Sequence, residues 1–184
     1  MSIEGKKIML LGGNFYQMTA TKAAKRLGCY VISVDYLPDN PAHIFADEYH
    51  NVSTTDKDAV LKLAEELQID GIISYASDVS APTAAYVAEK MGLPTNPYDA
   101  VLTLTRKDMI RPFMEANGFN IPRGKSFVEY NEAYRFFRSI KKPVMVKPVD
   151  ASGSKGVSKI SDEADFDKAF REAKKYSRSG IIIV

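Results

Sequence analysis

Residues 143–158 have the residue types of a phosphate-binding site. Lys147 ends an apolar run, and glycine, serine and lysine dominate the loop that follows it. The loop residues of interest are Ser152, Gly153, Ser154, Lys155 and Gly156. An ammonium group at a strand end supplies a fixed positive charge, and glycines let backbone N–H groups approach phosphate oxygens closely. The Walker spacing Gly-x-x-x-x-Gly-Lys-Ser/Thr is absent, which argues against a P-loop NTPase. Taken alone, the loop fits a mobile hairpin tip with a solvated lysine equally well.

A second candidate site follows the strands expected in the first half of the chain. Its residues come at the carboxyl ends of those strands: Gly12, Gly13, Asp35, Ser77 and Asp78. A Gly-Gly turn with a later strand-end acid is similar to dinucleotide-binding geometry, but Gly-x-Gly-x-x-Gly is absent, so NAD binding is disfavoured. Open parallel sheets bind ligands at this edge, which makes substrate contact a hypothesis for these residues. Helix capping and turn formation are the structural alternatives.

The other reactive residue types exclude several kinds of site. Cys29 is the single cysteine, so no disulfide can form within the chain and a reducing cytoplasm is the expected compartment. It precedes an apolar strand, so a buried small residue is expected rather than a nucleophile. His43 and His50 cannot assemble a His/Cys zinc set, and packing or surface roles are expected for both. No metal site is predicted in this chain.

Charge and hydropathy argue against nucleic acid and membranes as partners. The 25 Lys and Arg against 23 Asp and Glu leave a formal charge of +2, which does not favour a nucleic-acid or membrane-surface binder. The basic run on the last expected helix is predicted to be a solvated face: Lys168, Arg171, Lys174, Lys175 and Arg178. Near the start, only four apolar residues (8–11) precede Gly12, too few for a signal-peptide core or a membrane span.

The first half alternates strands with helices. Strands are predicted at residues 8–11, 30–34 and 71–75, because each is a short, continuous apolar run. Helices are predicted from apolar spacing, with Ala20, Ala23, Ala24 and Leu27 inward in the first, which Gly28 ends. A capping box at Thr55 and Asp58 opens the second, and the third lies around 84–91. Repeated strand–helix units predict an α/β fold with a doubly wound parallel sheet.

The second half has a different pattern. Helices are predicted to begin at a Thr105 cap, with Pro112 bending the first turns, and at an Asn131 cap. The second of these presents Ala133, Phe136, Phe137 and Ile140 on one face. Strands are predicted near 125–128, 143–147 and 157–160, and again at 181–184. A last helix faces inward with Phe166, Ala169, Phe170, Ala173 and Tyr176.

A domain junction is predicted at residues 94–97. Pro94 and Pro97 cannot continue a helix after the helix-stopping Gly92. The charge also switches there: residues 1–95 carry 8 basic and 12 acidic side chains (net −4), and residues 96–184 carry 17 and 11 (net +6). The sequence therefore predicts domains at residues 1–95 and 96–184.

Two lysines and the Ser/Gly loop occur in a characteristic order in the second half. Lys107 opens a helix eleven residues before Gly118, Lys147 ends a strand, and the Ser/Gly loop follows. This order and spacing resemble the ATP-grasp superfamily, which includes biotin carboxylase, the carbamoyl phosphate synthetase large subunit, D-alanine–D-alanine ligase and purine-biosynthesis carboxylases. The coarse pattern extends over essentially the whole chain.

The resemblance implies a Rossmann-like pre-ATP-grasp domain at 1–95, then linker helices at about 96–123 and a lid subdomain at about 124–184. It implies that Lys107 and Lys147 contact the phosphates of ATP, which is used with Mg²⁺. The loop residues implied to close over the β- and γ-phosphates are Ser152, Gly153, Ser154 and Gly156. The first-half edge would face the acceptor substrate.

The same resemblance implies pieces that this chain lacks. The adenine-holding Glu-rich hinge, the Mg²⁺ ligands and the catalytic residues are expected beyond Val184, so we expect a truncated chain that binds ATP poorly and is inactive. Pro148, Val149 and Asp150 also differ from the glycine-richest loops of the family. The implied complete enzyme joins a carboxylate to an amine or similar nucleophile through an acyl phosphate, takes small-molecule substrates, and has a homodimer as one possible assembly. The alternative is a non-catalytic Rossmann-like module that binds a nucleotide or metabolite.

Overall fold

The computed structural model describes residues 2–184. The chain divides into two compact units, Met1–Leu102 and Thr103–Val184, each with its own core. Helix α3 (Ala81–Lys90) and helix α4 (Tyr98–Thr105) flank residues 94–97, where the sequence predicts a junction. Contacts tie the start of α4 to α3, since the Tyr98 N–H donates to Glu89 (2.9 Å) and the Tyr86 and Tyr98 rings meet edge to face.

The first unit is built on a four-stranded parallel sheet of order β3-β2-β1-β4. Its strands are β1 (Lys7–Leu11), β2 (Tyr30–Val34), β3 (Glu48–His50) and β4 (Gly71–Ser74). Its other elements are α1 (Gln17–Arg26), the short 3₁₀ helix η1 (His43–Phe45), α2 (Lys57–Leu67) and α3. The sequence predicts no separate strand at β3, which has only three residues.

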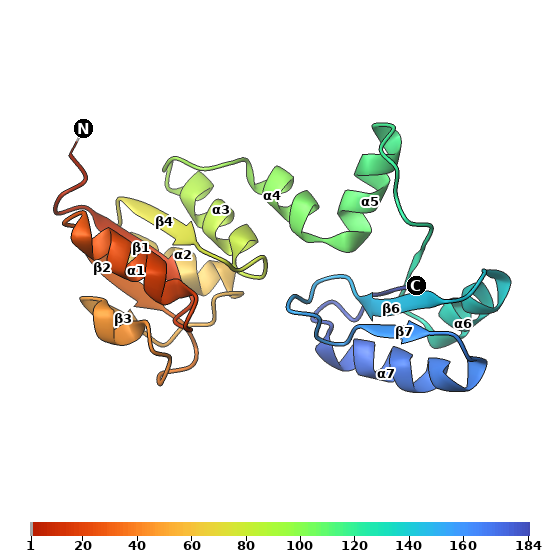
Figure 1. Ribbon diagram of the computed structural model, residues 1–184. Helices are drawn as coiled ribbons and strands as arrows, with labels where there is room; N and C mark the ends of the chain where they lie inside the picture. Colours follow the sequence, from red (N-terminus) through yellow and green to blue (C-terminus); the bar gives the residue numbers. More distant parts are fainter. Residues whose placement is uncertain (1) are drawn as a thin grey trace. The chain divides into compact units, whose positions relative to one another are not determined.

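Helices cover both faces of this sheet (Figure 1). On one face, Met9, Leu11, Ile32 and Val34 pack against apolar residues of α2 and α3. On the other, Leu10 and Val31 pack against α1. Alternate residues of one strand therefore enter different cores, which explains why β1 and β2 read as continuous apolar runs. The predicted doubly wound α/β arrangement is confirmed.

Two local predictions in this unit are wrong. The N-cap of α2 is Asp56, whose carboxylate accepts from the Ala59 N–H (3.1 Å), because the Thr55 hydroxyl is hydrogen-bonded to Ser53 (3.1 Å). Leu27 is exposed rather than inward, since α1 ends at Arg26 and Gly28 turns the chain with a φ of +79°. The buried side chains of α1 are Gln17 and Thr21.

The second unit contains a four-stranded antiparallel sheet of order β5-β8-β6-β7. Its strands are β5 (Ser126–Phe127), β6 (Val144–Pro148), β7 (Ser158–Ile160) and β8 (Ile182–Ile183). Its helices are α5 (Lys107–Ala116), α6 (Tyr130–Ser139), the short 3₁₀ helix η2 (Glu163–Asp165) and α7 (Phe166–Tyr176).

Helices α6 and α7 cover one face of this sheet (Figure 1). Val144 and Val146 of β6 pack against Phe137 of α6 and against Phe166 and Phe170 of α7. The Phe137 and Phe166 rings are stacked with centroids 4.6 Å apart. Because side chains alternate along a strand, Met145 and Lys147 emerge on the face opposite this core.

Corrections in the second unit concern helix starts and one inward residue. Helix α5 begins after Arg106, and Thr105 is the last residue of α4. Helix α6 begins after Glu129 instead of at the predicted Asn131 cap. Tyr176, predicted to face inward, is 38% exposed at the end of α7. The basic residues of α7 and the turn after it are exposed as predicted.

Candidate functional site

Lys107, the first residue of α5, is bound to the strand that precedes the Ser/Gly loop. Its backbone N–H donates to the Val149 carbonyl (3.1 Å), and its ammonium group donates to the carbonyl of Ala151 (2.9 Å) and more weakly to that of Val149 (3.5 Å). These bonds hold the start of α5 beside the end of β6. Lys107 therefore lies next to the start of the loop.

Lys147 projects from β6 on the face opposite the core and is half-buried. Partial burial lowers the pKa of its ammonium group, and the charges of Arg111 and Lys107 lower it further. The nearby carboxylate of Asp108 is engaged by Arg106 (Nη2 to Oδ2, 2.6 Å). Three cations, Lys107, Arg111 and Lys147, therefore lie close together, and the carboxylate nearest to them in α5, Asp108, is already paired with Arg106.

A cavity of about 440 Å³ opens beside Lys147. Its basic lining residues are Arg111, Arg123, Lys141 and Lys147, and it has no acidic one. Apolar side chains complete the wall: Pro122, Ile140, Pro143, Val144, Met145, Ile183 and Val184. A pocket lined by apolar side chains and several cations suits a ligand that combines an apolar part with negative charge.

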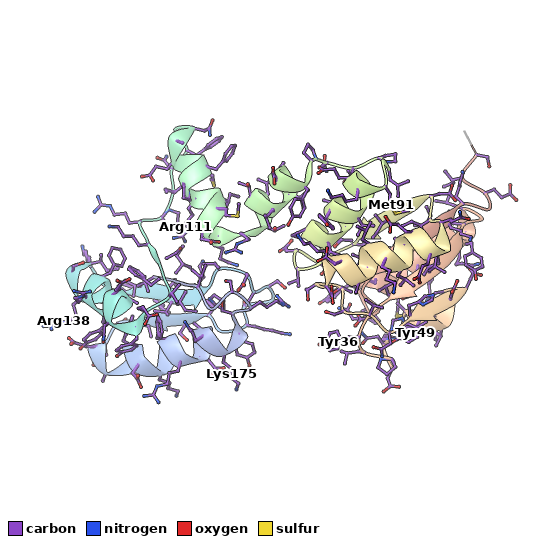
Figure 2. The ribbon with its side chains drawn as sticks, turned by 180° about the vertical axis from the view of Figure 1, so that it is seen from behind. Tyr36, Tyr49, Met91, Arg111, Arg138 and Lys175 are labelled. Carbon is purple, nitrogen blue, oxygen red and sulfur yellow. The ribbon has the colours of Figure 1, made fainter. Side chains whose placement is uncertain are left out.

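Sequence reasoning missed Arg111 of α5. Its guanidinium is half-buried, and this desolvation lowers its pKa. Figure 2 labels it on the part of α5 that borders the sheet of the same unit. The signal that could have found it is helical spacing: Arg111 follows Lys107 by four residues, so both lie on one side of α5.

The Ser/Gly loop joins β6 to β7. Gly153, Ser154 and Lys155 are exposed at its tip, and Gly153 and Ser154 have φ values of +64° and +58°. Gly156 is buried, with a φ of +68°, and a Cβ there would come within 3.2 Å of Pro148, Tyr176 and the Ala173 backbone. The tip is thus open to solvent, while Gly156 anchors the loop against α7.

Asp150, at the start of this loop, has a structural role. Burial opposes its ionisation, but hydrogen bonds from the Ser179 and Arg178 N–H groups and the Ser177 hydroxyl outweigh this and lower its pKa. Across residues 2–184, no cluster of three or more His, Cys, Asp or Glu side chains could hold a metal ion.

In the first unit, Gly12, Gly13 and Asp35 do come together at the carboxyl edge of the sheet. The Asp35 carboxylate is buried and accepts from the N–H groups of Gly13 (2.8 Å) and Leu37 (3.0 Å) and from the Asn40 amide (3.1 Å). These donors fix the turns after β1 and β2. The geometry is that of the structural alternative, turn formation.

His43 explains why residue 13 is glycine. Its ring nitrogens lie 2.8 Å from the Ser33 hydroxyl and 3.0 Å from the Leu37 carbonyl. A Cβ at Gly13 would lie 2.1 Å from this ring. Of the packing and surface roles expected for the two histidines, His43 has a packing role, and His50 pairs with Glu48 (2.6 Å).

Ser77 and Asp78 lie in the turn after β4. The Ser77 carbonyl accepts from the Ser74 hydroxyl (2.8 Å), and the Asp78 side chain is exposed. Exposed aromatic rings also follow the strand ends of this unit: Phe15, Tyr16, Tyr36 and Tyr75. Figure 2 labels Tyr36 in the loop after β2. This edge therefore offers rings and an exposed carboxylate to solvent.

Comparison with known proteins gives a family-model match within the second unit. Residues 106–182 match the model described as the ATP-binding domain of the carbamoyl-phosphate synthase L chain. The match begins at the residue before Lys107 and includes Lys147 and the whole Ser/Gly loop. Within residues 2–184, no helix has the length and apolar character needed to cross a bilayer.

Relatives and solved structures match nearly the whole chain. A formate-dependent phosphoribosylglycinamide formyltransferase of Prochlorococcus marinus (strain NATL2A) is 33% identical over 184 residues, 97% of this chain and 46% of that protein. The N5-carboxyaminoimidazole synthetase of Staphylococcus aureus, complexed with ADP, has a TM-score of 0.75 at 20% identity, covering 98% of this chain and 47% of that one.

A third match is the biotin carboxylase domain of the Hydrogenobacter thermophilus 2-oxoglutarate carboxylase, with a TM-score of 0.73 at 18% identity over 97% of this chain and 43% of that one. The chain thus spans about half the length of the proteins it matches. The chain therefore shares its fold with these structures, and its α5, β6 and Ser/Gly loop lie within the match to the carbamoyl-phosphate synthase ATP-binding domain.

Proposed function

We propose that the second unit holds the phosphates of ATP, bound with Mg²⁺, for a ligase that joins a carboxylate to an amine or similar nucleophile. The observation that carries this proposal is that Lys107 is bound to the start of the Ser/Gly loop and lies close to Lys147, whose own cavity has no acidic side chain in its lining. Unpaired cations in a half-buried site favour a polyanion, because charge pairing repays the desolvation that burial costs them.

Each group has a separate task in this proposal. Lys147 and Lys107 both offer ammonium groups to the phosphates, and Lys107 also donates to the Ala151 and Val149 carbonyls, which fixes it beside the loop. The hydroxyls and N–H groups of Ser152, Gly153 and Ser154 close over the β- and γ-phosphates, with Gly156 as the fixed end of the loop. Bound ATP supplies an activated phosphoryl group, and a closed loop excludes the water that would hydrolyse an acyl phosphate.

The carboxyl edge of the first unit is proposed to face the acceptor. There Gly12, Gly13 and Asp35 shape the turns, and Ser77 and Asp78 offer polar groups nearest to solvent. A small-molecule carboxylate or amine is the proposed substrate, and the cytoplasm the proposed compartment. The alternative is a nucleotide site on the first unit alone. In that case the Asp35 carboxylate would have to give up the hydrogen bonds it accepts from Gly13, Leu37 and Asn40 and accept from ribose hydroxyls instead.

Titration calorimetry of MgATP into the wild-type chain and into Lys147→Ala tests the nucleotide site. Removal of one ammonium contact is expected to raise the Kd about tenfold or more. The control is Lys175→Ala on the outer face of α7, where no change is expected. If Lys147→Ala binds normally while Asp35→Ala binds weakly, the nucleotide site belongs to the first unit instead.

A further inference from the structure

Arg111 and Lys147 are two half-buried cations that the protein leaves unpaired. Among residues 2–184, neither the Arg111 guanidinium nor the Lys147 ammonium has a hydrogen-bond acceptor or an ion-pair partner. Lys107 differs from them, because two backbone carbonyls accept from its ammonium group. Partial burial of an unpaired guanidinium costs free energy unless an anion pairs with it.

Three carboxylates lie within four residues of Arg111 or Lys147, and none forms an ion pair with either cation: Asp108, Glu115 and Asp150. Asp108 accepts from two nitrogens of Arg106, at 3.1 and 2.6 Å. Asp150 is surrounded by donors from residues 177–179. Neither Asp108 nor Asp150 is free to neutralise Arg111, so the positive charge faces the cavity.

The backbone makes room for this guanidinium. A Cβ at Gly124 would lie 2.6 Å from Arg111 Nη1, so a larger residue at position 124 would displace the side chain. Arg111 also lines a second, smaller cavity, of about 330 Å³, together with Lys107 and with Asp108, whose carboxylate is engaged by Arg106. Arg111 therefore lies between the two lysines, with one cavity on the side of each.

We propose that Arg111 is a third phosphate-binding residue, whose planar guanidinium holds two oxygens of the phosphate chain between Lys107 and Lys147. This proposal rests on the nucleotide site of the proposed function. A guanidinium presents a rigid fork of N–H donors that matches two oxygens of a phosphate, whereas an ammonium acts as a point charge. Arg111 thus fixes the direction of the phosphate chain as well as its charge.

Calorimetric titration of MgATP and of tripolyphosphate into Arg111→Gln and Arg111→Lys tests the proposal. Arg111→Gln is expected to raise both Kd values roughly tenfold. Arg111→Lys keeps the charge but loses the fork, so a smaller loss of roughly threefold is expected. Adenosine, which has no phosphate, should show the same affinity, or the same lack of binding, in every variant. The matched control is Arg138→Gln, an exposed arginine of α6 outside the cavity lining.

The remaining outcomes separate this proposal from the proposed function. If Lys147→Ala weakens MgATP binding while Arg111→Gln leaves it unchanged, the nucleotide site stands and the role of Arg111 is overturned. If the wild-type chain binds tripolyphosphate through Arg111 but does not bind MgATP, the anion role stands and the nucleotide assignment fails. If the wild-type chain binds neither probe, both proposals are wrong.

Discussion

At the scale of single residues, the charge of Lys147 is expected to favour anion binding and to lower the stability of the unliganded protein. Its ammonium group is half-buried beside Arg111 and Lys107, and both the burial and these charges disfavour its protonated form. A site prepared for an anion is expected to be strained while the anion is absent, since like charges then face one another. Residues of this kind favour ligand binding but lower the free energy of unfolding of the unliganded protein.

Replacement of Lys147 by methionine should therefore stabilise the unliganded chain while it weakens nucleotide binding. Met keeps the long apolar stem but removes the charge, and we expect a gain of about 0.5–1 kcal/mol in the free energy of unfolding. Urea unfolding with and without MgATP measures both effects. Lys175→Met on the exposed face of α7 is the control, where no gain is expected.

The gain should also depend on pH in a defined direction. The folded-state pKa of Lys147 lies below its unfolded value, so between the two pKa values the unfolded chain binds more protons and stability rises with pH. The penalty is complete below the folded pKa and is lost as the pH rises toward the unfolded one. The advantage of Lys147→Met should thus be largest near neutral pH and shrink in alkaline buffer. An advantage that grows with pH would contradict this assignment.

Residue types and spacing revealed part of this site in advance. Lys147 and the Ser/Gly loop are recognisable because an apolar strand, a lysine and small residues are local in sequence. The unpaired state of Arg111 could not be predicted from the sequence. It depends on the ion pair of Asp108 with Arg106 and on the hydrogen bonds that Asp150 accepts from residues 177–179. Competition among donors for a carboxylate is settled only in three dimensions.

At the scale of elements, the β6–β7 connection combines an open tip with a fixed end. Gly153 has a φ of +64° and open space where a Cβ would lie, whereas Gly156 has a similar φ but is enclosed by Pro148, Tyr176 and Ala173. The two glycines therefore share one backbone requirement and differ in the space around them. They form a matched pair for testing which half of the loop is structural.

Gly153→Ala should cost roughly 1 kcal/mol of stability, because alanine is strained at positive φ. Gly156→Ala should cost about 2–4 kcal/mol, since steric overlap with α7 adds to the same strain. Thermal unfolding of both variants measures the difference. Equal costs would mean that the packing of Gly156 against α7 contributes nothing.

Helices and strands with a strong apolar pattern could be predicted from the sequence. Their exact ends and the pairing of the strands were harder to predict. Helix α7 and strand β2 follow the apolar pattern closely, because a single face or a buried run dictates them. The start of α2 was misplaced, since Thr55 and Asp56 can both cap and only the bond between Thr55 and Ser53 decides between them. In the order β5-β8-β6-β7, the two-residue strands β5 and β8 pair although they lie far apart in sequence, which no local pattern encodes.

At the scale of the whole molecule, two cores support two different sites. The first unit places its candidate acceptor edge at the ends of parallel strands, and the second places its cations on the open face of an antiparallel sheet. The sequence predicts this change of class from the switch between strand–helix alternation and mixed elements. Each site can thus be disturbed through its own core.

Phe137→Ala tests whether the two cores unfold separately. Phe137 is fully buried against Phe166, and its truncation should cost about 3–5 kcal/mol because a cavity remains in the core of the second unit. Hydrogen exchange monitored by mass spectrometry should show faster exchange throughout Thr103–Val184 and unchanged exchange in β1 and β2. Phe113→Ala on α5, where the ring is 52% exposed, should leave both units nearly unaffected. If exchange in β1 rises together with that in β6, the two units fold as one cooperative body, and a change in either core would reach both sites.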